Sequence, residues 1–109
     1  MAKFKYIEWL VSFLESSDFF IFQWDDGNKT KSEMKHNVGI DQVESALLDA
    51  QILPLGLQYE PTVSEERYAV LGKDYSGNIL FICFTIRQGH IRPISARVAN
   101  KKERSIYER

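Results

Sequence analysis

The 109-residue chain contains one cysteine, Cys83, and two histidines, His36 and His90, that are far apart in the sequence. A single cysteine excludes a disulfide within the chain and favours a reducing compartment. No Cys/His group has the spacing of a zinc site. We interpret Cys83 as a small core residue of a strand rather than as a nucleophile. The sequence therefore argues against a disulfide-rich secreted domain and against a metal site.

Long apolar runs are also absent, since none approaches the roughly 20 residues that cross a bilayer. The apolar stretch that follows Lys3 and Lys5 resembles a signal peptide, but Glu8 and Glu15 interrupt it and no cleavage site follows. We therefore expect a cytoplasmic protein without a membrane partner. No metal motif, phosphate-binding loop, dinucleotide loop or Ser-His-Asp arrangement occurs, so we expect no cofactor.

The composition is that of one ordinary globular domain, with 44% apolar and 27% charged residues. Its charge is unevenly distributed. Residues 1–66 contain 5 Lys/Arg and 12 Asp/Glu, whereas residues 67–109 contain 9 Lys/Arg and 3 Asp/Glu, although the whole chain has a net charge of only −1. The basic half either faces a polyanion or is neutralised by the acidic half across the fold.

Residues 4–15 have helical periodicity and predict the first helix. The other residues of this stretch are apolar, and its polar residues form one narrow stripe. The stripe consists of Lys5, Glu8, Ser12 and Glu15. So wide an apolar surface either packs into the core or covers a partner, such as a second copy of the chain.

Three further helices are predicted. Residues 29–36 are polar and helical in pattern. Asp41 followed by Glu44 three residues later has the form of a capping box, and so has Asn100 followed by Glu103 near the C-terminus. We therefore expect Asp41 and Asn100 to cap the starts of two helices.

The remaining segments have the composition of strands, and the longest of them is apolar almost throughout, as in a central strand. Turns at residues 74–78 and 88–89 predict an antiparallel meander. Helices before and after the strands favour an α+β fold with one sheet. The predicted strands cover residues 19–24, 52–57, 67–72, 79–86 and 90–98.

Arginines concentrate on these strands, with Arg67 at the start of one and Arg87 at the end of another. Arg92 and Arg97 lie five residues apart, which places them on opposite faces of a regular strand. A bulge, or a kink at Pro93, would change that relation.

Several guanidinium groups on one sheet could form a phosphate clamp, because each matches phosphate in a bidentate manner. Such a clamp would suit RNA cleavage by the 2′-hydroxyl, which needs no metal if cations stabilise the phosphate in the transition state. The alternative is that these arginines are solvated or paired with acidic residues of the chain: Glu65, Glu66 and Glu103.

Three blocks of the sequence resemble the BrnT family. Residues 22–25 (FQWD) and 35–38 (KHNV) are similar to its F-x-W-D and K-H-G-V motifs, and residues 66–72 (ERYAVLG) to its E-R-[FY]-x-x-[LI]-G motif. Residues 91–107 are similar to I-R-x-I-S-A-R-x-A-x-x-x-E-R-x-x-Y, which is the most specific of the blocks. The resemblance extends over residues 20–108.

This resemblance implies a RelE-like α+β fold for residues 19–109, an antiparallel meander with two or three helices packed on it. Residues 1–18 have no counterpart in the family and would be an N-terminal helical extension that contacts an antitoxin, mediates self-association or extends the core. The implied protein is a metal-independent ribonuclease toxin of a type II toxin–antitoxin pair. Its partners would be RNA, a BrnA-like ribbon-helix-helix antitoxin and, only through that antitoxin, operator DNA.

The resemblance also implies site residues. We expect Arg67, Arg92 and Arg97 to contact the phosphate and its transition state, and His36 or Lys35 to transfer protons. His36 is the better candidate because imidazole titrates near neutrality, although a histidine at a helix C-terminus is also favoured by the helix dipole. The resemblance adds four RNA-binding candidates: Tyr68, Ser95, Arg104 and Tyr107.

The chain departs from the family pattern at three positions. Asn37 stands where the family has Gly, and Asn can replace Gly at a left-handed helix end. Asn28 and Ser32 stand where Lys and Asn are usual, which motivates a second hypothesis, a non-catalytic toxin-like module that binds an antitoxin or nucleic acid. A third hypothesis is a purely structural role through the N-terminal helix.

Overall fold

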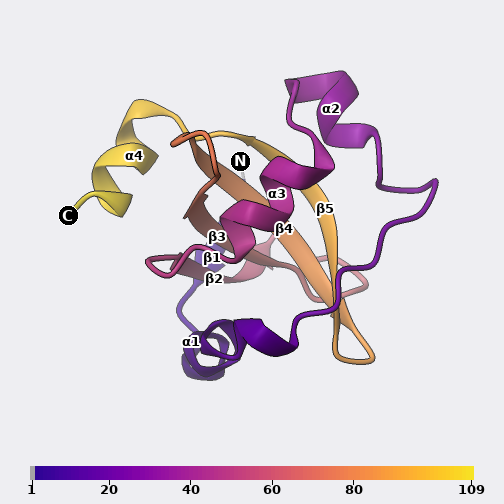
Figure 1. Cartoon of the computed structure of the whole chain (residues 1–109). Coiled ribbons are helices and arrows are strands. Elements are labelled where there is room, and N and C mark those ends of the chain that lie inside the picture. Colours follow the sequence, from indigo (N-terminus) through magenta and orange to yellow (C-terminus); the bar gives the residue numbers. More distant parts are fainter. Residues whose placement is uncertain (1) are drawn as a thin grey trace.

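The computed structural model describes residues 2–109, which build one five-stranded sheet with helices on both of its faces (Figure 1). The strands lie in sequence order, and each pairs with its neighbour in an antiparallel manner. This is the predicted α+β fold with an antiparallel meander, and it is consistent with a RelE-like toxin. The strands are β1 (Lys3–Lys5), β2 (Leu53–Glu60), β3 (Tyr68–Lys73), β4 (Ile79–Arg87) and β5 (His90–Val98).

Four α-helices accompany the sheet, together with a short 3₁₀ helix (Ser17–Phe19). Helices α1 and α3 pack on one face, α2 lies beside β5, and α4 packs near β3 and β4 (Figure 1). None of the helices described for residues 2–109 has the length and apolarity needed to span a bilayer. The helices are α1 (Glu8–Glu15), α2 (Lys31–His36), α3 (Ile40–Leu47) and α4 (Lys101–Tyr107).

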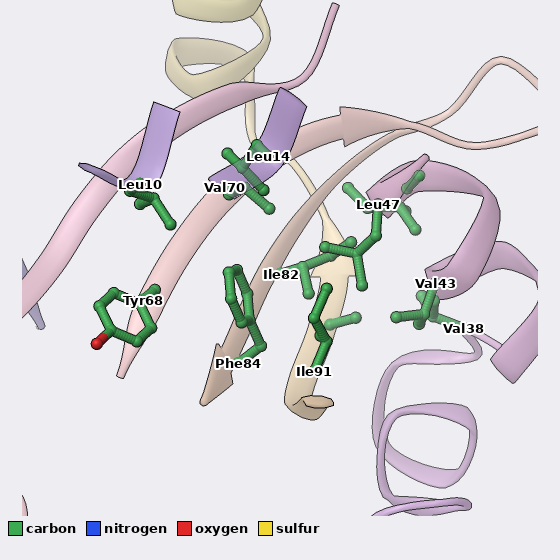
Figure 2. Packing of buried hydrophobic residues seen from close by; sticks show 13 residues of the cluster. Leu10, Leu14, Val38, Val43, Leu47, Tyr68, Val70, Ile82, Phe84 and Ile91 are labelled. Carbon is green, nitrogen blue, oxygen red and sulfur yellow. The ribbon is translucent and has the colours of Figure 1, made fainter. Parts of the chain in front are cut away.

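The main core lies between one face of the sheet and helices α1 and α3, as Figure 2 shows. Alternate residues of each strand point into it, because side chains of a strand alternate between its two faces. Helix α3 approaches β3 so closely that a Cβ at Gly72 would lie 2.2 Å from the carbonyl oxygen of Ala46. The labelled core residues are Leu10, Leu14, Val38, Val43, Leu47, Tyr68, Val70, Ile82, Phe84 and Ile91.

The predicted helix over residues 4–15 begins only at Glu8, and the residues before it form β1. Here the pairing of β1 with β2 overrides the helical pattern, since Phe4 lies opposite Gln58. The centroids of the Phe4 and Phe81 rings are 6.0 Å apart. The predicted polar stripe is confirmed for Glu8, Ser12 and Glu15, which lie on α1 and are exposed, but not for Lys5, which lies on β1. The extension thus contributes both an edge strand and a core helix.

The predicted strand over residues 19–24 is wrong except for one bridge, in which Phe22 pairs with Ile91 in a parallel manner. The N–H of Gln23 donates to the carbonyl of Ile91 at 2.8 Å, and the N–H of Ile91 donates to the carbonyl of Ile21 at 2.8 Å. Beyond this point helix α2, rather than a strand, lies beside β5. The segment around Phe22 therefore pairs with β5 at one bridge and does not form a continuous series of strand hydrogen bonds.

Helix starts follow the prediction in one case and depart from it in the other. Asn100 caps α4, since its side chain accepts from the N–H of Glu103 at 2.8 Å while the Glu103 carboxylate accepts from the N–H of Asn100 at 2.9 Å. The predicted cap at Asp41 is wrong. Gly39 is the N-cap of α3, and its N–H donates to Oε1 of Gln42 at 3.0 Å. Asp41 lies in the first turn, where its charge complements the helix dipole.

Candidate active site

A β-bulge in β5 brings its functional side chains to one face of the sheet. The register with β4 shifts between Pro93 and Ser95, so Ile94 is an extra residue. Residues 81, 83 and 85 of β4 share one face, and their partners in β5 are Arg97, Ser95 and Arg92. The bulge therefore makes a spacing of five equivalent to four, and Arg92 and Arg97 lie on the same face.

Helix α2 is fixed beside this face by hydrogen bonds at two of the three positions that depart from the family pattern. The hydroxyl of Ser32 accepts from the N–H of Ala96 at 2.7 Å. The side-chain amide of Asn28 donates to the carbonyls of Gln23 at 3.0 Å and Pro93 at 2.8 Å. Both residues thus join the segment containing α2 to β5.

The end of α2 places Lys35 and His36 at the same surface. Asn37, with a φ of 57°, adopts the left-handed conformation that was expected where the family has glycine. Its N–H donates to the carbonyl of Glu33 at 3.0 Å, and that bond closes the last turn. His36 is therefore the last helical residue, beside the sheet rather than away from it.

Between α2 and the sheet lies a cleft of about 290 Å³, which we call the basic cleft. Its lining contains four Lys/Arg side chains and one histidine, and no Asp or Glu. Helix α2, β4, β5 and the residue preceding β3 all contribute to it. The lining residues are Lys31, Ser32, Lys35, His36, Arg67, Phe81, Ile94, Ser95, Ala96 and Arg97.

Three cations of the basic cleft have no acidic partner within residues 2–109. Lys31 and Lys35 are exposed and one helical turn apart, and Arg67 is half-buried; none of the three forms a salt bridge there. Uncompensated cations that converge on one hollow attract an anion, and the forked guanidinium suits phosphate in particular. Lys31, Lys35 and Arg67 thus supply the unneutralised positive charge of the cleft.

Arg97 differs from these three because it is already paired. Its two terminal nitrogens donate to the Glu103 carboxylate at 2.8 and 2.9 Å. Its guanidinium carbon lies 4.4 Å from the centroid of the Phe81 ring. The hydrogen bond to Glu103 raises the pKa of Arg97 above its ordinary value, so the guanidinium stays charged. The predicted alternative, an arginine paired with Glu103, is confirmed here.

A second hollow of about 150 Å³ adjoins the basic cleft and shares Lys31, Arg67 and Ile94 with it. It contains Arg92, whose terminal nitrogens donate to the Asp25 carboxylate at 2.7 and 3.0 Å. That bond, with a further one from the N–H of Gly27, lowers the pKa of Asp25 below its usual range. Arg92 thereby fastens the loop before α2 to β5.

Arg87 also lines the second hollow and makes the same kind of pair with Glu65, at 2.7 and 2.9 Å. The hydrogen bond from Arg87 lowers the pKa of Glu65. The alternative of a paired arginine is therefore confirmed for Arg87 as well. Arg67 is the arginine shared by both hollows that keeps its positive charge uncompensated within residues 2–109.

Tyr68 lies away from the basic cleft, in the core on the other face of the sheet. Its ring packs against that of Trp9, with the ring centroids 5.2 Å apart, and its hydroxyl donates to the Glu66 carboxylate at 2.9 Å. Burial, together with the bond to Glu66, raises the pKa of Tyr68 to about 12. The RNA-binding role of Tyr68 stays a prediction, without support from its position.

The two candidates on α4 are also outside the lining of the cleft. Arg104 donates to the carbonyl of Ala99 at 2.8 Å, and the hydroxyl of Tyr107 donates to Asp49. Burial and the bond to Asp49 raise the pKa of Tyr107 to about 12. Both contacts connect α4 to its surroundings, and an RNA-binding role stays a prediction for each.

Sequence reasoning missed two residues with a direct place in the cleft, Lys31 and Phe81. Lys31 could have been found, since it precedes Lys35 by one turn and shares its helix face. Phe81 gave no local signal, because only the pairing of β4 with β5 places it beside Arg97. The interpretation of Cys83 as a core residue is confirmed by its 7% exposure, and burial raises the pKa of its thiol.

A family model described as the ribonuclease toxin BrnT of a type II toxin–antitoxin system matches residues 24–103. The match contains every residue that lines the basic cleft, whereas β1 and α1 lie outside it. A search of curated proteins found no match to the chain. Within residues 2–109, no group of three or more His, Cys, Asp and Glu side chains has the arrangement of a metal site.

Proposed function

The chain belongs to the BrnT family of ribonuclease toxins of type II toxin–antitoxin systems, and from this premise we propose that its basic cleft is the site of RNA cleavage. Membership implies an RNA substrate and an antitoxin partner. One observation carries the proposal: three unpaired cations and His36 line a cleft that contains no carboxylate. A bound phosphate would supply the anion that these cations lack.

In the proposed reaction the 2′-hydroxyl of one nucleotide attacks the adjacent phosphorus. The P–O2′ bond forms, the P–O5′ bond breaks, and the products end in a 2′,3′-cyclic phosphate and a 5′-hydroxyl. A base must accept the 2′ proton, and the departing 5′ oxygen must gain a proton. His36 is the group of the cleft best suited to proton transfer, with Lys35 beside it as the alternative.

Arg67, Lys31 and Lys35 are assigned to the charge of the phosphate. Negative charge on its oxygens increases in the pentacoordinate transition state, so cations already aimed at that position stabilise it more than the ground state. No step of this scheme uses a metal. Catalytic roles for Arg92 and Arg97 stay predictions, because carboxylates occupy the ends of both guanidinium groups.

The finer description of the partners is also proposed rather than established. We expect a BrnA-like ribbon-helix-helix antitoxin, with operator DNA bound only through it, in the cytoplasm. Self-association through the N-terminal helix is favoured by apolar side chains that remain exposed near it, since Trp9 is 43% and Phe19 82% exposed.

The test is cleavage of single-stranded RNA by the purified chain in the presence of EDTA, with analysis of the product ends. We expect 5′-hydroxyl and cyclic-phosphate ends. His36→Gln is expected to slow cleavage by about 10² to 10⁴, the usual contribution of a general acid or base. Arg67→Gln is expected to slow it by about 10² or more. Arg109→Gln, at an exposed position outside both hollows, is the control.

Folded variants at positions 36 and 67 that cleave at the parent rate would overturn the site. Cleavage that stops with EDTA and returns with a divalent cation would overturn the metal-free reaction. Circular dichroism of each variant separates loss of activity from loss of fold.

A second candidate is a non-catalytic module that binds RNA or an antitoxin. It is favoured by Asn28 and Ser32, whose side chains are engaged in backbone hydrogen bonds instead of supplying the usual Lys and Asn. It predicts salt-dependent RNA binding with no cleavage products. The same experiment therefore discriminates the two functions.

A further inference from the structure

The guanidinium of Arg97 is held as a rigid plane by two neighbours. Arg97 lies directly opposite Phe81 in the pairing of β5 with β4, and its guanidinium carbon is 4.4 Å from the centroid of that ring. Stacking of a guanidinium on an aromatic face is favourable and orients its plane. One face of the Arg97 group is therefore covered by Phe81.

Glu103 occupies the end of the same guanidinium. Its two carboxylate oxygens accept from the two terminal nitrogens of Arg97, and Oε1 also accepts from the N–H of Asn100 at the start of α4. The carboxylate is thus anchored by the helix cap as well as by Arg97, and its side chain is only 17% exposed. A phosphate could take that end of Arg97 only by displacing an anchored carboxylate.

What remains accessible belongs to the basic cleft. The side chain of Arg97 is 36% exposed, and both Arg97 and Phe81 line the cleft near the unpaired Lys31, Lys35 and Arg67. A flat, charged group with one face covered and its end occupied presents its other face to a ligand. Nucleobases stack on Arg guanidinium planes in single-stranded RNA recognition.

We propose that Arg97, stacked on Phe81 and held by Glu103, is a platform on which a nucleobase of the RNA stacks, rather than a ligand of its phosphate. This rests on the proposed function, because it places the base beside the phosphate that Lys31, Lys35 and Arg67 hold. Arg97 would then orient the nucleotide, and the three unpaired cations would supply the charge.

The test compares two uncleavable ligands of the full chain: a 2′-deoxy hexanucleotide, and a fully abasic hexamer with the same phosphates and no bases. The parent is expected to bind the intact hexamer about tenfold more tightly, the effect of one stacked base. In Arg97→Lys, which keeps the charge but lacks the planar group, this preference is expected to fall below about twofold, with unchanged affinity for the abasic hexamer. Lys35→Gln is the control and is expected to lower the affinity for both hexamers by the same factor.

A second measurement replaces one base of the hexamer by 2-aminopurine, whose fluorescence is quenched by stacking. Quenching by the parent that is lost in Arg97→Lys and reduced in Phe81→Leu supports the platform. Equal affinity of the parent for both hexamers would overturn the platform alone. An Arg97→Lys variant whose affinity for both hexamers falls by the same factor would also overturn it. Failure of the parent to bind either hexamer would overturn the proposed function as well.

Discussion

At the scale of single residues, what an arginine of this sheet can do depends on the carboxylate nearest to it. Arg87, Arg92 and Arg97 each donate two hydrogen bonds to one carboxylate, whereas Arg67 has none within residues 2–109. A bidentate pair fixes geometry and removes net charge, so the paired arginines position parts of the protein. Arg67 is left to attract a phosphate.

The pair of Arg92 with Asp25 leads to a prediction about pH. Because Arg92 holds the folded-state pKa of Asp25 below its unfolded value near 3.9, the pair stabilises the fold above about pH 4 and loses that effect as pH falls through the folded pKa. Asp25→Asn is therefore expected to lower the Tm at pH 7 and to match the parent at the most acidic pH at which both fold. Thermal unfolding from pH 3 to pH 8 measures this.

The neighbouring Asp26→Asn is a matched control, because Asp26 is 97% exposed and pairs with the exposed Lys29. It is expected to leave the Tm nearly unchanged at every pH. A destabilisation by Asp25→Asn that is the same at pH 3 and pH 7 would contradict the role of the carboxylate charge.

At the scale of helices and strands, the sequence predicted what local chemistry determines. The cap of α4 was predicted because Asn100 and Glu103 interact with each other across three residues. The cap of α3 was not, since Gly39 offers no side chain and uses Gln42 instead. Residues 19–24 have the composition of a strand, but strand formation also needs a free edge, and α2 packs against part of the free edge of β5.

In the candidate site, too, the sequence predicted the residues that belong to local motifs and missed contacts between distant segments. Lys35 and His36 on α2 and Arg97 on β5 were predicted from motif blocks, whose residues lie close together in the chain. The pair of Asp25 and Arg92 joins residues 67 positions apart, and Phe81 reaches Arg97 only through strand register. Such contacts arise from the three-dimensional pairing of distant segments, which no local pattern contains.

Helix α1 provides a test at this scale, because it lies outside the part of the chain that matches the family. Leu10 is fully buried in the main core. Leu10→Ala is expected to lower the free energy of unfolding by about 3 kcal/mol, through lost burial and the cavity that remains. Ser12→Ala, on the exposed face of the same helix, is the control and is expected to change it by less than about 0.5 kcal/mol.

Urea unfolding of the two variants measures both values. If Leu10→Ala were as stable as the parent, α1 would be an appendage rather than part of the core, and the extension could be removed without loss of the fold.

At the scale of the whole molecule, the uneven charge of the two halves is only partly neutralised. Acidic residues of the first half pair with Arg87 and Arg92 of the second, as the neutralisation alternative predicted, while the basic cleft keeps three unpaired cations. A protein with a net charge of −1 can therefore present a locally positive surface to RNA.

This arrangement predicts salt-dependent binding in spite of the negative net charge. Three phosphate contacts on a single strand give a slope of log affinity against log salt of about −2, since each contributes about 0.7. Fluorescence anisotropy with an uncleavable oligonucleotide over a range of NaCl concentrations measures the slope. Lys35→Gln is expected to reduce its magnitude by about 0.7.

Lys3→Gln is the matched control, because Lys3 pairs with Glu60 at the opposite edge of the sheet. It is expected to leave the slope unchanged. A slope near zero for the parent would contradict an electrostatic role of the basic cleft.

The bulge at Ile94 has a consequence for how relatives of this chain are to be aligned. A chain without that residue would have its two β5 arginines four positions apart and, in a regular strand, still on one face. A one-residue gap that removes the bulge therefore preserves the arrangement of the site, whereas a one-residue gap in a strand without a bulge would place the two arginines on opposite faces. Loss of residue 94 is thus compatible with an unchanged arrangement of the two arginines, and an alignment should permit a gap there.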